Sequence, residues 1–121
     1  MSETLDVIRN HFTTEEEALA EIGAMGWHSY VTDHVITEDE EWHWHDFEAV
    51  VYLVRGNQSV ELRDRRIESG PGCFARAPAG VIHRELAGTN CRVVFGFPVQ
   101  VTELTQPVNK PCEELEAFLR G

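Results

Sequence analysis

The chain has 121 residues, of which 42% are hydrophobic and 26% are charged, and this length and composition fit one globular domain. The net charge of -11 argues against nucleic acid or an anionic membrane surface as a partner, because both require clustered Lys and Arg. No apolar run approaches the roughly 20 residues that cross a bilayer, and the first residues have neither a basic start nor an apolar signal core. We therefore expect a cytoplasmic protein with no nucleic-acid or membrane partner.

The N-terminal segment, residues 1–26, is predicted to be helical. A helix is expected over 14–25, because Thr13 and Thr14 both offer N-caps and each has a glutamate three positions later. A shorter helical turn is expected at about 4–10.

From residue 28 the pattern changes to short apolar runs separated by Gly, Pro, Asn and Asp, which is typical of an antiparallel sandwich or barrel. The expected strands are His28–Ile36, Trp42–Phe47, Ala49–Arg55, Ser59–Arg63, Gly72–Ala77, Ile82–Leu86 and Arg92–Phe97. Gly56-Asn57 is the expected turn between the third and fourth strands. Beyond a barrel at about 28–97, the segment 98–121 is predicted to be an irregular tail followed by a short helix that Pro111 opens.

The run Ala49–Val54 is apolar except for the phenol of Tyr52, so both faces of this strand are expected to be covered. One face would line the barrel interior. The other requires a second sheet, the N-terminal helix or another subunit, and we expect a homodimer.

Cys73, Cys91 and Cys112 are an odd number of cysteines at wide spacing, which predicts free, mostly buried thiols in a reducing compartment.

Three histidines are the candidate metal ligands. Side chains at i and i+2 of a strand share a face, so His43 and His45 project together. His83 follows the tight turn Pro78-Ala79-Gly80 on a second strand. Imidazole nitrogens gathered in this way suit one divalent metal ion.

The segment that contains His43 and His45 resembles the first motif of the cupin superfamily, G-x5-H-x-H-x(3,4)-E-x6-G. Both histidines and the closing Gly56 match. The chain departs from the motif at the leading glycine, where Thr37 stands, and at the glutamate, where Ala49 stands.

The second cupin motif, G-x5-P-x-G-x2-H-x3-N, is matched at Gly72, Pro78, Gly80 and His83, with Ala87 in place of Asn. The resemblance implies an all-β double-stranded β-helix (jelly-roll) barrel, here with an N-terminal helix and a short C-terminal helix. It also implies one metal ion inside the barrel, such as Fe, Zn, Mn or Ni. It says little about the substrate, since cupins include dioxygenases, decarboxylases, isomerases and non-catalytic binding domains.

The fourth ligand is left open. Ala49 cannot bind a metal, and Glu48 lies on the opposite strand face unless a bulge redirects it. Glu41 is in phase with His43 and His45 on an extended strand. The remaining alternative is a three-histidine site completed by water or substrate.

Other pocket residues follow from the same alternation. Glu85 shares a face with His83 and is a candidate acid or base, and Arg76 is a candidate partner for a substrate carboxylate, although a surface position is the simpler interpretation. The expected core or pocket wall comprises Val51, Leu53, Phe74, Phe95 and Phe97. Trp42 and Trp44 should face away from the metal and pack under the N-terminal segment or at a dimer interface. His34 could enter the barrel from the first strand.

The predicted function is that of a metal-binding cupin, with a non-haem, dioxygenase-like enzyme that acts on a small chelating organic molecule as the leading hypothesis. A three-nitrogen site with open positions can hold such a molecule beside a small co-substrate such as O2. The alternatives are a non-catalytic domain that binds or senses a small molecule, and a barrel without metal.

Overall fold

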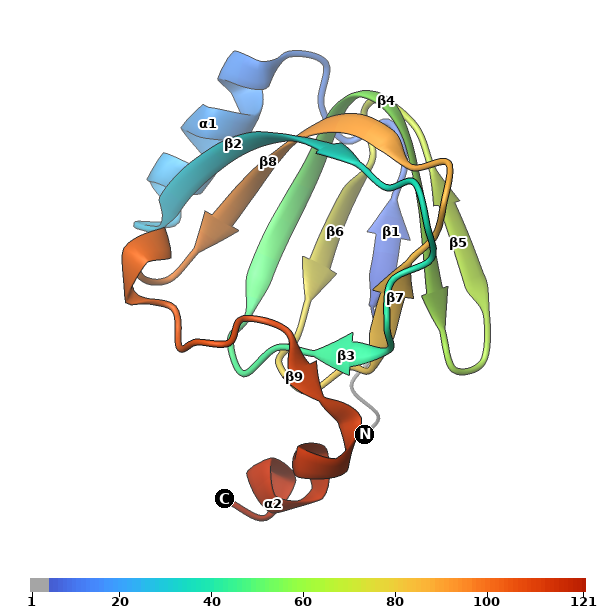
Figure 1. Ribbon diagram of the computed structural model, residues 1–121. Coiled ribbons are helices and arrows are strands. Elements are labelled where there is room, and N and C mark those ends of the chain that lie inside the picture. The colour runs from blue at the N-terminus through green and yellow to red at the C-terminus, as the bar shows by residue number, and fades with distance from the viewer. Residues whose placement is uncertain (1–4) are drawn as a thin grey trace.

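The computed structural model describes residues 5–121, in which strands predominate over helices (Figure 1). The strands are β1 (Asp6–Ile8), β2 (His28–Val35), β3 (His43–Trp44), β4 (Ala49–Leu62), β5 (Arg66–Ser69), β6 (Phe74–Ala77), β7 (His83–Glu85), β8 (Asn90–Phe97) and β9 (Lys110–Pro111). The helices are α1 (Glu15–Ala24) and α2 (Leu115–Arg120), with 3-10 turns at Val101–Glu103 and Cys112–Glu114. None of the helices in this part of the chain is long and apolar enough to cross a membrane.

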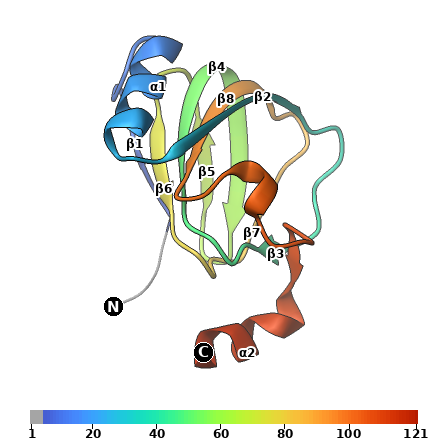
Figure 2. The ribbon, with the colours of Figure 1, turned by 90° about the vertical axis from the view of Figure 1, so that its left-hand side faces the viewer.

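All strand pairs in the described chain are antiparallel, and β4 is shared by two sheets. Its first half pairs with β6 and β8, which extends to the order β1-β6-β4-β8-β2. Its second half pairs with β5 and β7, which gives the order β5-β4-β7-β3-β9. The two sheets face each other across the interior (Figure 2), as in the sandwich that the sequence predicts.

The strand β4 runs through Gly56 and Asn57, so the turn predicted there is wrong and the two predicted strands are one. The register of β4 against β8 shifts between Leu53 and Arg55, as in a β-bulge, and Gly56 has a φ of +87°. A Cβ at Gly56 would lie 2.1 Å from the carbonyl oxygen of Asn90. The glycine therefore allows β8 to approach the backbone of β4 closely. It does not form a turn between two strands.

The helix α1 occupies the segment where the sequence predicts a helix, and it covers the outer face of the first sheet. Thr14 is the N-cap, and it exchanges hydrogen bonds with Glu17 in a capping box. Ile22 packs with Val50 and Val94 in one buried cluster, and full burial of each such side chain stabilises the fold by about 1.5–3 kcal/mol. The apolar outer face of β4 is thus covered within the chain. A second subunit is therefore not needed to cover this face, and the homodimer stays a prediction.

The helical interpretation of residues 1–26 is wrong for residues 6–8. These form β1, an edge strand in which Val7 pairs with Ala75 of β6. A three-residue strand has almost no periodicity of its own, so pairing with β6 determines its conformation. The expected turn at residue 4 lies outside the described residues. Strands β5 and β9 were not predicted either, because each is too short to show a periodic pattern.

The three cysteines are free thiols, as the sequence predicts. Cys73 and Cys91 are buried and Cys112 is half-buried.

Gly56→Ala is expected to lower the free energy of unfolding by more than Gly88→Ala does. Both glycines have a positive φ, but a Cβ at Gly88 meets open space. The control should therefore lose only the conformational cost of about 1–2 kcal/mol, whereas Gly56→Ala adds a backbone clash of about 1–3 kcal/mol. Urea denaturation of both variants measures the difference, and equal losses would contradict the tight approach of β8.

Iodoacetamide at about pH 8 should alkylate Cys112 in the folded protein and spare Cys91 until the protein unfolds. Burial raises the pKa of the Cys91 thiol to about 11, so the reactive thiolate is scarce at that pH. Mass spectrometry of peptides from folded and guanidinium-unfolded samples tests this. If Cys91 were modified at the same rate in both samples, it would not be buried in the folded protein.

Candidate metal centre and pocket

The predicted histidine cluster is present. Strand β3 pairs with β7 so that His43 lies directly opposite His83, and His45 follows two residues after His43. The ring centroids are 4.5 Å apart for His43 and His83, 5.0 Å for His43 and His45, and 4.9 Å for His45 and His83. One candidate ligand atom from each ring lies within 4.8 Å of the other two. The fold therefore brings together residues that the sequence separates by about forty positions.

Each imidazole is oriented by a backbone carbonyl that accepts a hydrogen bond from its Nδ1. The acceptor for His43 is Glu41 O at 2.8 Å, for His45 it is Val108 O at 2.8 Å, and for His83 it is a carbonyl two residues before it, at 2.9 Å. A carbonyl oxygen only accepts, so Nδ1 must carry the hydrogen and Nε2 keeps its lone pair. All three rings thus have the tautomer and the orientation that a metal ligand needs.

The environment also keeps the rings of His45 and His83 neutral. Burial lowers the pKa of His83 to about 4, and burial likewise lowers the pKa of His45. Metal binding at neutral pH then displaces no proton from these two residues, which favours binding. Neutral imidazole donors of this kind suit divalent zinc, iron, nickel or copper, so the donor set fits the implied ion.

Segments on both sides of the cluster position it. Gly80, in the turn before β7, has a φ of +84°, and its N–H donates to the carbonyl of His45 at 2.9 Å. On the other side, the indole Nε1 of Trp44 donates to Pro111 O at 2.8 Å, and its ring packs on Phe118 of α2 at 4.8 Å. The prediction that Trp44 packs under the N-terminal segment or at a dimer interface is therefore wrong, because the C-terminal segment covers it.

Trp42, the other tryptophan of this segment, lies between two guanidinium groups. Arg63 and Arg84 are 4.8 and 4.7 Å from its ring centroid. The alternation argument does not apply to Trp42, because β3 begins at His43.

The two carboxylates proposed as a fourth ligand lie elsewhere. Glu48 is exposed and pairs with Arg76 at 3.4 Å, so neither Glu48 nor the pocket candidate Arg76 reaches the cavity. No bulge redirects Glu48, because β4 begins only at Ala49. Glu41 is exposed and contributes its carbonyl, not its carboxylate. The phase argument for Glu41 fails because β3 begins at His43.

Glu40, which was not predicted as a site residue, has a carboxylate that lies near the three histidines. Its Oε1 is 4.0 Å from Nε2 of His43 and accepts the backbone N–H of Glu85 at 3.0 Å. It stands in an acidic run of four residues, and no spacing signal distinguishes it from its neighbours.

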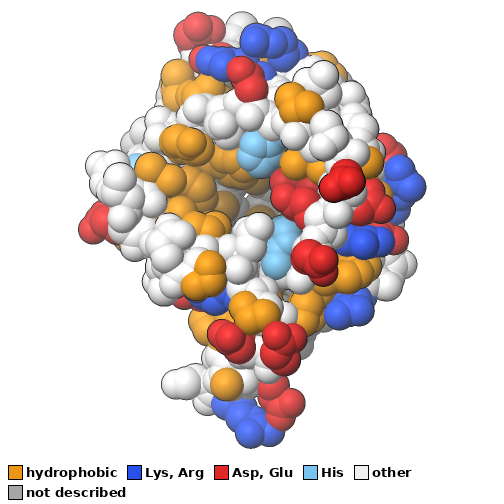
Figure 3. All heavy atoms as spheres, in the orientation of Figure 1, with side chains coloured by type: hydrophobic (Ala, Val, Ile, Leu, Met, Phe, Trp, Pro, Cys, Tyr) orange, Lys and Arg blue, Asp and Glu red, His pale blue; other side chains and the backbone are white. Residues whose placement is uncertain are grey.

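The histidines open into a cavity of about 360 Å³. Figure 3 shows the molecule hollowed here, with hydrophobic side chains on one side of the opening and Asp and Glu side chains on the other. The predicted wall residues Val51, Leu53, Phe74, Phe95 and Phe97 all line the cavity.

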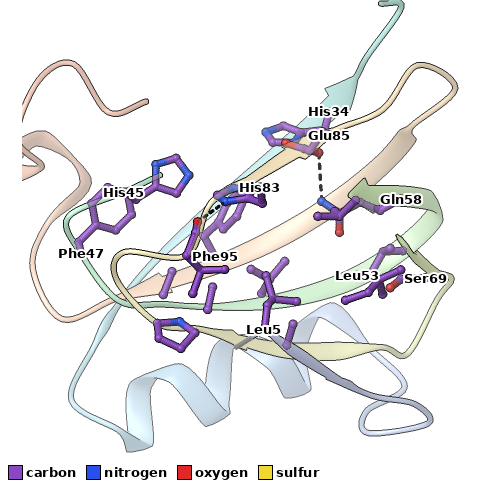
Figure 4. Close-up of a pocket in the computed structure, with 18 of the residues that line it drawn as sticks. Leu5, His34, His45, Phe47, Leu53, Gln58, Ser69, His83, Glu85 and Phe95 are labelled. Carbon is purple, nitrogen blue, oxygen red and sulfur yellow. Dashed lines mark hydrogen bonds and ion pairs between the residues drawn. The ribbon is translucent and has the colours of Figure 1, made fainter. Parts of the chain in front are cut away.

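Glu85 lines the cavity, as predicted, and so does His34. His34 of β2 donates from Nδ1 to Glu85 at 3.3 Å, and Gln58 Nε2 donates to the same carboxylate oxygen at 3.1 Å (Figure 4). Burial raises the pKa of Glu85, but the bonds from His34 and Gln58 and the charge of His34 outweigh it, and the pKa is lowered. The bond to Glu85 raises the pKa of His34 against the effect of burial. Both shifts favour an ion pair.

Gln58 was missed because the bulge in β4 changes which face is inside. Before the bulge, the odd-numbered Val51 and Leu53 line the cavity; after it, the even-numbered Gln58 and Val60 do. One extra residue in a strand reverses the facing of every later side chain. The only hint of this bulge in the sequence is Gly56, which was predicted to be part of a turn.

The chain is similar to solved structures of cupin proteins. A cupin-2 domain containing protein from Shewanella frigidimarina superposes with a TM-score of 0.52 at 23% identity, over 60% of this chain and 71% of that chain. A DUF861 family protein from Thermotoga maritima gives a TM-score of 0.55 at 16% identity, over 78% and 99% of the two chains. The polyketide cyclase RemF from Streptomyces resistomycificus gives 0.51 at 22% identity, over 74% and 68%. At these identities the similarity concerns the fold.

No protein with a curated description matches the chain. The family described as the AraC-like ligand binding domain matches residues 28–115, which include every strand from β2 to β9, the three histidines and the tail that supports them. With its cupin fold, the chain therefore belongs to the AraC-like ligand-binding domain family.

Proposed function

We propose that the protein binds one divalent metal ion through Nε2 of His43, His45 and His83, and that the ion and the adjoining cavity together hold a small chelating organic molecule. The observation that carries this proposal is the set of three Nδ1–carbonyl hydrogen bonds, which leaves Nε2 of each ring free, on three rings whose candidate ligand atoms lie within 4.8 Å of one another. Three protein ligands leave coordination positions free for such a molecule.

When bound, the ion supplies a Lewis acid and, if it is iron, redox chemistry with O2. The protein supplies the rest. The cavity wall excludes water from the bound molecule, and the ionised Glu85 can accept a proton from it or return one. His34 and Gln58 hold that carboxylate in place and keep it ionised. This combination supports a metal-dependent enzyme, of which a non-haem dioxygenase is the form that the ligand set favours.

A second candidate is a domain that binds or senses the same kind of molecule without turnover. The family match favours it, because that family is described by ligand binding rather than by a reaction. Both candidates share the metal site and the cavity, and they differ in whether Glu85 moves a proton.

His43→Ala or His83→Ala should reduce metal content from about one ion per chain to background, since two imidazoles hold a divalent ion poorly. Elemental analysis of protein purified without added metal, and again after incubation with Zn²⁺, measures this. His28→Ala is the matched control, because His28 of β2 does not line the cavity and the variant should keep its metal. A wild-type protein that holds no more metal than His43→Ala would refute the site.

Glu85→Gln should lower kcat for oxygen consumption by about 10²- to 10⁴-fold while leaving metal content unchanged, since the amide cannot accept a proton. The assay uses iron-reconstituted protein with thiols, diketones and small carboxylic acids. Glu48→Gln, at an exposed carboxylate outside the cavity, should behave as wild type. If no compound of these classes supports oxygen consumption although ligands bind at the metal, the non-catalytic candidate replaces the enzyme.

A further inference from the structure

We propose that the molecule bound in this cavity has a single metal-binding head group and an otherwise uncharged, mostly apolar body. This inference rests on the proposed function, because the histidine-bound metal holds the head group. The new element is the chemistry of the ligand body, which the rest of the cavity selects.

The wall away from the histidines is hydrophobic. It is formed by Val51 and Leu53 before the bulge of β4, by Val60 after it, and by Ile67 and Phe95 of the neighbouring strands. Val60 and Ile67 are direct cross-strand partners, so they form a continuous apolar surface. Figure 4 shows Leu5 and Leu53 on this side of the cavity, with Ser69 beside Leu53, and it shows His34, Gln58 and Glu85 on the other side. Apolar groups of a ligand would replace water against this wall, which favours binding.

The opposite wall carries carboxylates and no basic side chain that is free to pair with an anion. One oxygen of Glu85 accepts from His34 and Gln58, and one oxygen of Glu40 accepts from the backbone of Glu85. None of the described lining residues is Lys or Arg, and His34 is balanced by Glu85. A second anionic group on a ligand would therefore lose its hydration without gaining a cationic partner.

The opening adds an electrostatic condition. The acidic run at residues 38–41 contains Glu40, which lines the cavity beside His43, and Figure 3 shows Asp and Glu side chains gathered on one side of the hollow. An anionic group on the body of the ligand would meet this field without a cation to offset it. One anionic or chelating group is accommodated only where the metal neutralises it.

The size of the cavity limits the body to a single ring or a short chain. Its volume of about 360 Å³ is close to the lower end of the usual range for ligand sites, which is about 300–1,000 Å³. Apolar walls that enclose space without a partner forfeit dispersion contacts, so an apolar body of fitting size restores them.

Three hydroxamates with the same chelating head test the inference by calorimetric titration of the zinc-loaded protein. Cyclohexanecarbohydroxamate should bind at least about tenfold more tightly than acetohydroxamate, since burial of several methylene groups favours the larger probe. Gluconohydroxamate, with a polyhydroxylated body, should bind more weakly than cyclohexanecarbohydroxamate. A ratio below about tenfold, or a preference for the polyol, would overturn the inference.

Two variants locate the effect. Val60→Thr places a hydroxyl in the apolar wall at nearly constant volume and should weaken cyclohexanecarbohydroxamate by about three- to tenfold without changing acetohydroxamate. Val54→Thr is the matched control, because Val54 is half-buried on the same strand but packs toward α1, and it should leave both affinities unchanged. Equal effects of the two substitutions would show that the wall does not contact the body.

Acetohydroxamate separates this inference from the proposed function. If it binds the zinc-loaded wild type but not His43→Ala, the metal site stands, and the body comparison alone decides the inference. If it does not bind the wild type, the proposed function fails and this inference fails with it.

Discussion

The shared strand β4 is the constraint on which the rest of the domain depends, because it pairs with β5, β6, β7 and β8 and so belongs to both sheets. Its first half is covered by α1, and its second half sets the position of β7. The strand β7 in turn brings His83 opposite His43. The bulge between Leu53 and Arg55 and the missing side chain at Gly56 allow the strand to continue from one sheet into the other while β8 approaches closely. The cavity wall and the three clustered histidines therefore share one structural support.

The three imidazoles are held by backbone rather than by other side chains. Their Nδ1 atoms donate to carbonyls of the loop before β3, the turn before β7 and the tail before β9, of which Val108 O belongs to a segment without regular structure. A backbone carbonyl in a packed segment has little freedom to move, so the ring orientation is set before any ion arrives. The tail is itself fastened by Lys110, which is buried and donates to Pro107 O at 2.7 Å, and by the indole of Trp44. The C-terminal segment is thus part of the site.

The polarity of the cavity is divided in a way that follows from its strands. β7 and the preceding loop bring His83, Glu85 and Glu40, and β2 brings His34, whereas β4, β5 and β8 bring mostly Val, Leu, Ile and Phe. His34 and Glu85 bond to each other, which favours the ionised form of both although they are partly buried. Polar groups are thereby concentrated on the histidine side of the cavity, and most of the remaining wall is apolar.

Local signals in the sequence determined the fold class, the capping of α1, the existence of most strands, and the identity of the three histidines. Alternation, capping boxes and motif spacing act over a few residues and are legible without knowledge of the partner strands. Only the tertiary structure decided that Gly56 lies within a strand, after a bulge, and not in a turn. It also decided that Gln58 faces inward, that Glu40 rather than Glu48 or Glu41 lies near His43, and that the C-terminal tail orients an imidazole. Each of these depends on strand register or on contacts between distant segments, and a shift of one residue in register reverses which side chains face the cavity.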